Sequence, residues 1–227
     1  MASTGSAAAA PPALPLCLSL AGLEAFVALM GRDALANKTT ADVKELLKAL
    51  QPPLPAAAAV HLPALRPHCG LPTAFISHSY SNPFLGMVES VREWEHSAPP
   101  PRAGGCHYYY FDLLVEYQGF DLPGPPAKLQ FEFLRDRFGS RVASVEHTLL
   151  VLDWSRGEPA APGGGGGGDG GGEGAGALAR GQIQVPRPLT SAWCAFEIAM
   201  TTVHNVPLTV LLTKDDTGVF LVDIETG

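Results

Sequence analysis

The apolar run HTLLVLDW at residues 147–154 constrains the fold of this chain more than any other feature. Its apolar residues follow one another without the alternation of polar and apolar side chains that marks a strand with one face in water. Strands covered on both faces are typical of parallel sheets, whose crossover connections place helices over the sheet. The run therefore predicts a central strand of a parallel α/β sheet.

Three further segments have the composition of strands of the same sheet. They are the apolar run at 72–78, the aromatic and branched run HYYYFDLLVEY at 107–117, and VPLTVLLT at 206–213. Helical patterns separate them, as parallel neighbours require. This order predicts a flavodoxin-like parallel sheet of four to five strands with flanking helices. The last apolar run, GVFLVDI at 218–224, either forms a minimal fifth strand or belongs to a truncated end of the domain.

The helices between these strands have recognisable start signals. Asn82 is expected to cap a helix with Pro83 in its first position, because Asn accepts hydrogen bonds from free N–H groups and Pro lacks an N–H. Another helix is expected around 129–138. The last begins at Thr190 or Ser191. Its sheet-facing stripe is expected to consist of Ala192, Phe196, Ala199 and Val203.

Composition divides the chain into parts. The Ala- and Pro-rich leader at 1–13 and the glycine-dominated insertion at 157–181 are expected to be disordered, because they cannot bury enough apolar surface. Apolar residues at helical spacing predict a helical segment at 14–51, and clustered prolines predict an extended connector at 52–71. Residues 72–227 form the α/β domain that carries the insertion.

Charge, cysteines and hydropathy exclude several classes of protein. The net charge is −7 with only 15 Lys and Arg, which disfavours a nucleic-acid surface, because neutralising phosphates needs clustered cations. The four cysteines form no CxxC pair, so neither a metal site nor a disulfide framework is indicated. The apolar stretch 13–30 lacks a basic leader and contains Glu24, so we expect no membrane contact and a cytoplasmic protein, with an organellar transit peptide as the minor alternative.

Polar residues follow the predicted strands at one edge of the sheet. They lie at 77–82, 112–119 and 153–156, where open parallel sheets bind their ligands. The alternative for Ser77 and Ser79 is that they satisfy backbone groups at the turn between strand and helix. A Ser/His nucleophile is disfavoured, because Ser77 and His78 are neighbours on a strand and face opposite sides.

Glu197 is the most distinctive polar residue of the last predicted helix. Trp193 and Cys194 lie four and three residues before it, so they neighbour Glu197 on the helix surface. A carboxyl group among such side chains has its charged form disfavoured and its pKa raised, which is a known route to catalytic or binding function. The alternative is a half-exposed glutamate without a special role.

Three stretches in this order resemble the TIR (Toll/interleukin-1 receptor) domain family, and its TIR-like branch in algae, protists and bacteria more closely than the animal receptors. AFISHSYSNPF is similar to the first strand of the family, TLLVLDWS to its third strand, and PLTSAWCAFEI to its S-x-W-C-x-x-E helix. The likeness covers residues 72–213 once the glycine insertion is looped out. It implies a flavodoxin-like sheet and a role in signal transduction.

The resemblance also implies a site. In enzymatic TIR domains the glutamate of the W-C-x-x-E helix is required to cleave the bond between nicotinamide and ribose in NAD, and Glu197 matches it. Trp193 and Cys194 match the flanking pair. The loops after the first two strands would contact the nucleotide, which adds Ser77, His78, Ser79, Tyr80, Ser81 and Asp112 as binding candidates. NAD would then be a substrate of an NAD nucleosidase, and no prosthetic group is expected.

A second implication competes with the first. Many TIR domains act as non-enzymatic modules that assemble with other TIR domains, so self-association as such a module is the competing expectation, and the intact W-C-x-x-E helix tips the balance toward the nucleotide site. A nucleoside-modifying hydrolase or transferase on the same kind of sheet is a third alternative.

Overall fold

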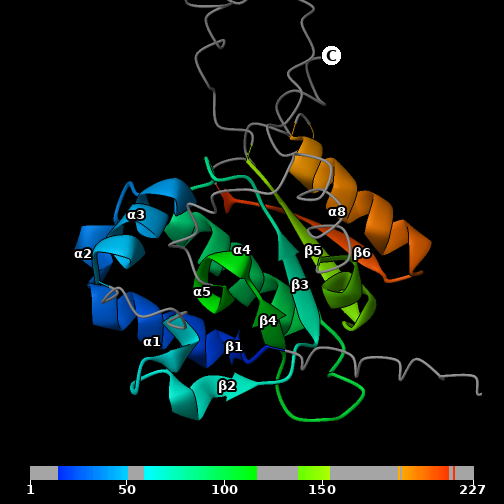
Figure 1. Ribbon diagram of the computed structural model, residues 1–227, viewed down its shortest axis with the longest axis horizontal. Helices are drawn as coiled ribbons and strands as arrows, with labels where there is room; N and C mark the ends of the chain where they lie inside the picture. The colour runs from blue at the N-terminus through cyan, green and yellow to red at the C-terminus, as the bar shows by residue number, and fades with distance from the viewer. Residues whose placement is uncertain are drawn as a thin grey trace, which may run out of the picture.

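A computed structural model describes residues 15–50, 59–116, 138–153, 189, 191–214 and 217. Its strands form one six-stranded mixed sheet in the order β2-β1-β4-β3-β5-β6, with helices packed around it (Figure 1). The strands are β1 (Cys17–Ser19), β2 (Cys69–Gly70), β3 (Ala74–Ser77), β4 (Tyr108–Tyr110), β5 (His147–Leu152) and β6 (Leu208–Leu212). The helices are α1 (Leu20–Met30), α2 (Arg32–Leu35), α3 (Thr40–Leu50), α4 (Phe84–Ser97), α5 (Asp112–Val115), α8 (Ala192–Val203) and the short 3-10 helices η1 (Ala59–His61) and η2 (Arg66–His68).

Four neighbouring strands are parallel, as predicted. β3 pairs with β4 on one side and with β5 on the other, and β5 pairs with β6. Across the sheet these four strands follow the order β4, β3, β5, β6. Numbered by their place in the chain, this order is second, first, third, fourth. All of β5 except His147 is buried, which confirms the inference that its unbroken apolar run is covered on both faces.

The sheet is mixed rather than purely parallel, which corrects the prediction. β1 joins it antiparallel to β4, with Leu18 opposite Tyr109, and β2 is antiparallel to β1. β1 occupies the start of a segment that we predicted to be helical. The helix α1 begins only after Ser19, whose Oγ accepts a hydrogen bond from the N–H of Gly22. A three-residue strand has too few residues to show a periodicity of its own.

Two other segments differ from their predicted conformation. The run at 107–117 forms a strand only over β4, and the chain then enters the helical turn α5, where Asp112 Oδ1 accepts the N–H of Leu113 at 2.8 Å. The described part of the connector at 52–71 contains the 3-10 helices η1 and η2 and the short strand β2, so it is not extended throughout as predicted. Pro67 lies in the first turn of η2, where its missing N–H has no cost.

The predicted helix starts are only partly correct. Pro83 is the N-cap of α4 and Phe84 its first residue, while Asn82 caps nothing: its Nδ2 donates to the carbonyl of Val151 at 3.0 Å. Ser191 is the N-cap of α8 but makes no side-chain capping bond. Thr190, the leader, the insertion at 157–181, the run at 218–224 and residues 129–137 of the predicted helix lie outside the described residues.

The face that α8 turns toward the sheet is also different from the predicted one. Its buried residues are Cys194, Glu197 and Thr201, whereas the predicted stripe is exposed except for the half-buried Phe196. Thr201 Oγ1 lies 3.0 Å from Thr148 Oγ1 on β5. A helix whose outer face is also apolar misleads a periodicity argument, because the apolar stripe no longer marks the buried side. No helix in the described ranges is long and apolar enough to cross a membrane.

Candidate functional site

Ser77 and Glu197 meet at the carboxyl end of β3. Ser77 is the last residue of that strand and is fully buried, and Glu197 points inward from the middle of α8. The Ser77 hydroxyl donates a hydrogen bond to Glu197 Oε2 at 2.6 Å, across 120 residues of sequence. The alternative in which Ser77 only satisfies backbone groups of the turn therefore does not describe its side chain.

Glu197 is a buried carboxyl group with an altered acidity. Its residue is only 3% exposed, so the half-exposed alternative is wrong. Burial raises the pKa of the Glu197 carboxyl to about 8; the charge of Asp112 acts in the same direction, whereas hydrogen bonds from Ser77 and Trp193 oppose it. Near neutral pH the group can therefore exist either as an acid or as a carboxylate.

The two residues that precede Glu197 on its helix surface have different roles. Cys194 is buried, and its thiol donates to the carbonyl of His78 at 3.3 Å, which ties α8 to the end of β3. Burial raises the pKa of the Cys194 thiol, so it is not a ready nucleophile. The half-buried Trp193 ring packs edge-on against Phe138 at 4.7 Å between ring centroids.

His78, Tyr80 and Asp112 form a second group beside this pair. The Tyr80 hydroxyl donates to Asp112 Oδ2 at 3.2 Å, and His78 Nδ1 lies 3.7 Å from Asp112 Oδ1. The His78 ring is buried against Tyr80 and Phe111. Burial lowers the pKa of His78, although the Asp112 charge works against this shift, so its ring is neutral at pH 7.

Asp112 connects the two groups electrostatically. Its charge raises the pKa of Glu197, and the charges of Asp112 and Glu197 both raise the pKa of the Tyr80 hydroxyl. Ser79 and Ser81 lie in the adjoining turn, where their hydroxyl oxygens are 2.9 Å apart. That contact favours the alternative in which Ser79 stabilises the turn. The structure thus gathers the predicted residues at one end of the sheet, and Ser77 is the one that donates a hydrogen bond to Glu197.

Nothing in the sequence indicated that α3 packs against residues 79–82 of the candidate site. Thr40 N–H donates to the carbonyl of Asn82 and Ala41 N–H to the carbonyl of Tyr80, both at 2.9 Å. The Thr40 hydroxyl donates to the carbonyl of Ser79 at 3.0 Å, and Lys44 Nζ lies 4.8 Å from the centre of the Tyr80 ring. No sequence signal links these segments, because the pairing depends on how two distant parts of the chain pack.

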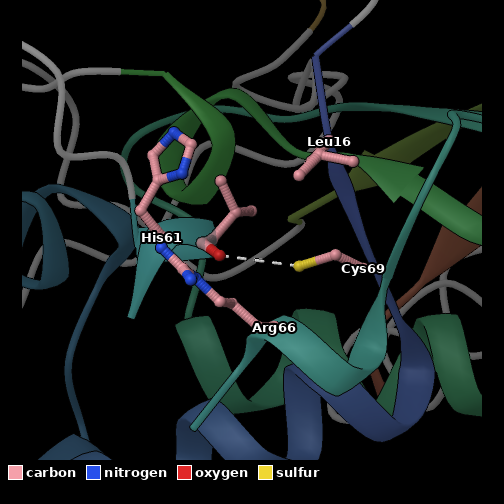
Figure 2. Close-up of a pocket in the computed structure, with 5 residues that line it drawn as sticks. Leu16, His61, Arg66 and Cys69 are labelled. Carbon is pink, nitrogen blue, oxygen red and sulfur yellow. Dashed lines mark hydrogen bonds between the residues drawn. The ribbon is translucent and has the colours of Figure 1, made fainter. Parts of the chain in front are cut away.

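A hollow of about 450 Å³ lies elsewhere, beside β1, η1 and η2 (Figure 2). Leu16, Val60, His61, Arg66 and Cys69 line it. The Cys69 thiol donates to the carbonyl of Val60 at 3.5 Å there. None of the predicted site residues lines this hollow, so the Glu197 group and the hollow are separate features.

The chemistry available at the Glu197 group is that of a titratable carboxyl among hydroxyl groups. A carboxyl of this kind can hold sugar hydroxyls, transfer a proton, or stabilise a positive charge that develops on a substrate. Among the described residues, no three His, Cys, Asp or Glu side chains are placed to hold a metal ion together. Comparisons with protein-family models, with curated proteins and with solved structures found no match to this chain.

Proposed function

We propose that this chain contains a TIR-like domain that cleaves NAD at the bond between nicotinamide and ribose, with Glu197 as the essential carboxylate. The observation that carries the proposal is the buried contact of Glu197 with Ser77 at the carboxyl end of β3. The order of the four parallel strands supports it, since flavodoxin-like sheets have this order and bind ligands at that edge.

The reaction suits a carboxyl with this acidity. When the bond from C1′ to the nicotinamide nitrogen breaks, its electron pair leaves with nicotinamide and positive charge develops on the ribose. Water then adds its oxygen to C1′ and releases a proton. The cationic nicotinamide ring of bound NAD favours the ionised form of Glu197, which is held ready to stabilise the developing charge. Ser77 orients the carboxylate through its hydrogen bond.

The test is nicotinamide release from NAD by the full-length protein, measured by chromatography at several protein concentrations. We expect the wild type to release nicotinamide and Glu197→Gln to lose at least about 100-fold in rate, because the amide cannot carry the negative charge. Glu45→Gln is the matched control, since Glu45 is an exposed residue of α3 paired with Lys48. Absence of release by the wild type at every concentration would refute the proposal.

A second function has an observation in its favour. Among the described strands, β6 is the last of the sheet, and it presents exposed apolar side chains: Leu208 is 41% and Val210 is 51% exposed. Unprotected apolar edge strands are sites of pairing between chains. An assembly module that associates through β6 therefore accounts for this edge, and it is compatible with an enzyme that works in the associated state.

A further inference from the structure

We propose that Lys44, on α3, binds the diphosphate of the nucleotide that occupies the Glu197 site. This inference rests on the proposed function and adds a residue from outside the stretch that carries the family resemblance. Its starting point is the position of the Lys44 ammonium group, 4.8 Å from the centre of the Tyr80 ring. Tyr80 in turn donates its hydroxyl hydrogen bond to Asp112, the residue whose charge acts on Glu197.

The helix that carries Lys44 is fixed to the site. Its first turn donates two backbone hydrogen bonds and one hydroxyl hydrogen bond to the carbonyls of residues 79–82. Thr39 extends this contact by a bridge to Pro83. Lys44 lies one turn after Thr40 on the same helix, so its side chain leaves α3 over the turn that these bonds hold.

A diphosphate bound beside the Glu197 group would need a positive charge to stabilise it. A nucleotide diphosphate is an anion, while the Glu197 group contributes the carboxyl groups of Glu197 and Asp112. The N-terminal N–H groups of α3, which otherwise suit a phosphate, are engaged by the carbonyls of Tyr80 and Asn82. A positive side chain is therefore the remaining way for α3 to attract a phosphate.

Lys44 is available for this role. In the described part of the chain it makes no ion pair, whereas Lys48, one turn further along α3, is paired with Glu45 at 2.7 Å. Its contact with the face of Tyr80 is a cation–π interaction, which positions the ammonium group without using its N–H donors as hydrogen bonds to any described residue. The geometry thus favours substrates that carry a diphosphate over nucleosides that lack one.

The experiment compares Lys44→Gln with Lys48→Gln in the full-length protein on two substrates, NAD and nicotinamide riboside. For Lys44→Gln we expect the KM for NAD to rise about tenfold or more, as for the loss of one charge-assisted hydrogen bond, with kcat within about twofold. The KM for nicotinamide riboside should not change, because this substrate has no phosphate. Lys48→Gln should match the wild type on both. Equal kinetics of Lys44→Gln and wild type on NAD, or equal losses on both substrates, would overturn the inference.

Binding of ADP-ribose, measured by titration calorimetry, separates this inference from the proposed function. If the wild type releases no nicotinamide but binds ADP-ribose, and Lys44→Gln binds it at least about tenfold more weakly, the inference holds and the proposed reaction is wrong. If the wild type neither cleaves NAD nor binds ADP-ribose, both are wrong. Thermal unfolding of both variants should match the wild type, which shows that the changes are not caused by misfolding.

Discussion

At the scale of single residues, Glu197 is unusual because it is an ionisable side chain in a buried position. It lies on the buried face of α8, where an apolar residue would pack without a penalty for desolvation. Among the described residues, hydrogen bonds from Ser77 and Trp193 stabilise its carboxylate, whereas burial and the charge of Asp112 disfavour it. Such a costly arrangement is expected at functional sites, where stability is exchanged for reactivity.

The raised pKa of Glu197 predicts a specific dependence of stability on pH. In the folded protein the pKa of this carboxyl is about 8, so it keeps its proton up to that pH, whereas the unfolded chain loses the proton near the ordinary glutamate pKa of 4.5. Between these values the folded state binds more protons, so the free energy of unfolding falls as pH rises and levels off above the folded pKa. We expect a loss of roughly 2 kcal/mol between pH 6 and pH 8 from this group.

The measurement is denaturant unfolding of the wild type and of Glu197→Gln across this pH range. Gln is uncharged and can still accept the Ser77 hydrogen bond, so the variant should lack the fall in stability. The difference between the two proteins isolates Glu197 from His78, whose lowered pKa makes the folded protein less stable as pH falls below the ordinary histidine value. Parallel pH curves for the two proteins would contradict a raised pKa at Glu197.

At the scale of elements, some strands and helices were predictable from the sequence and others were not, for physical reasons. β5 and its parallel neighbour β3 were predictable, because buried strands leave apolar runs. The apolar run 206–213 also predicted the strand β6, but the expectation that this strand is buried was wrong, because its residues are exposed or half-buried at the end of the sheet. β1 and the place of α3 were not predictable. β1 is too short to have a period, and α3 is joined to residues 79–82 through backbone groups that every residue carries. Glu197 was singled out from its neighbours on the helix, but the stripe predicted to face the sheet did not include it, because α8 is apolar on both sides.

The exposed strand β6 supports a prediction about association. If its apolar edge joins two copies of the chain, we expect the wild type to dimerise as its concentration rises. Val210→Lys should shift that equilibrium toward the monomer by at least about tenfold, because a charge at an edge strand opposes pairing. Light scattering coupled to size-exclusion chromatography measures the masses. Val203→Lys, an exposed change on α8 outside the strand, is the control. A wild type that stays monomeric at high concentration would rule out this interface.

At the scale of the whole molecule, the N-terminal segment is part of the same sheet as the candidate site. β1 pairs with β4, and the Phe26 ring of α1 meets Phe84 of α4 with 5.7 Å between ring centroids. On the surface, the ion pair from Arg92 to Glu24 at 3.0 Å joins the same two helices, and the ion pair from Arg32 to Glu89 at 2.6 Å joins α2 to α4. The buried core runs through both parts without a break. The segment is therefore expected to fold and unfold together with the strands that carry Ser77 and the helix that carries Glu197.

Leu18→Ala tests that cooperativity. Leu18 is 1% exposed in β1, so truncation leaves a cavity in the shared core, and we expect a loss of about 2–5 kcal/mol in the free energy of unfolding. Leu29→Ala is the control, because Leu29 on α1 is 52% exposed and its loss should cost no more than about 0.5 kcal/mol.

Hydrogen exchange, followed peptide by peptide, shows which parts of the chain lose protection in Leu18→Ala. In a cooperative molecule, the most protected amides of β5 and β6 exchange faster in Leu18→Ala by the same factor as those of β1 and β4. Unchanged protection of β5 and β6 would instead show that the N-terminal segment unfolds as a separate unit, and Lys44 would then lie on a part of the protein that can leave the site.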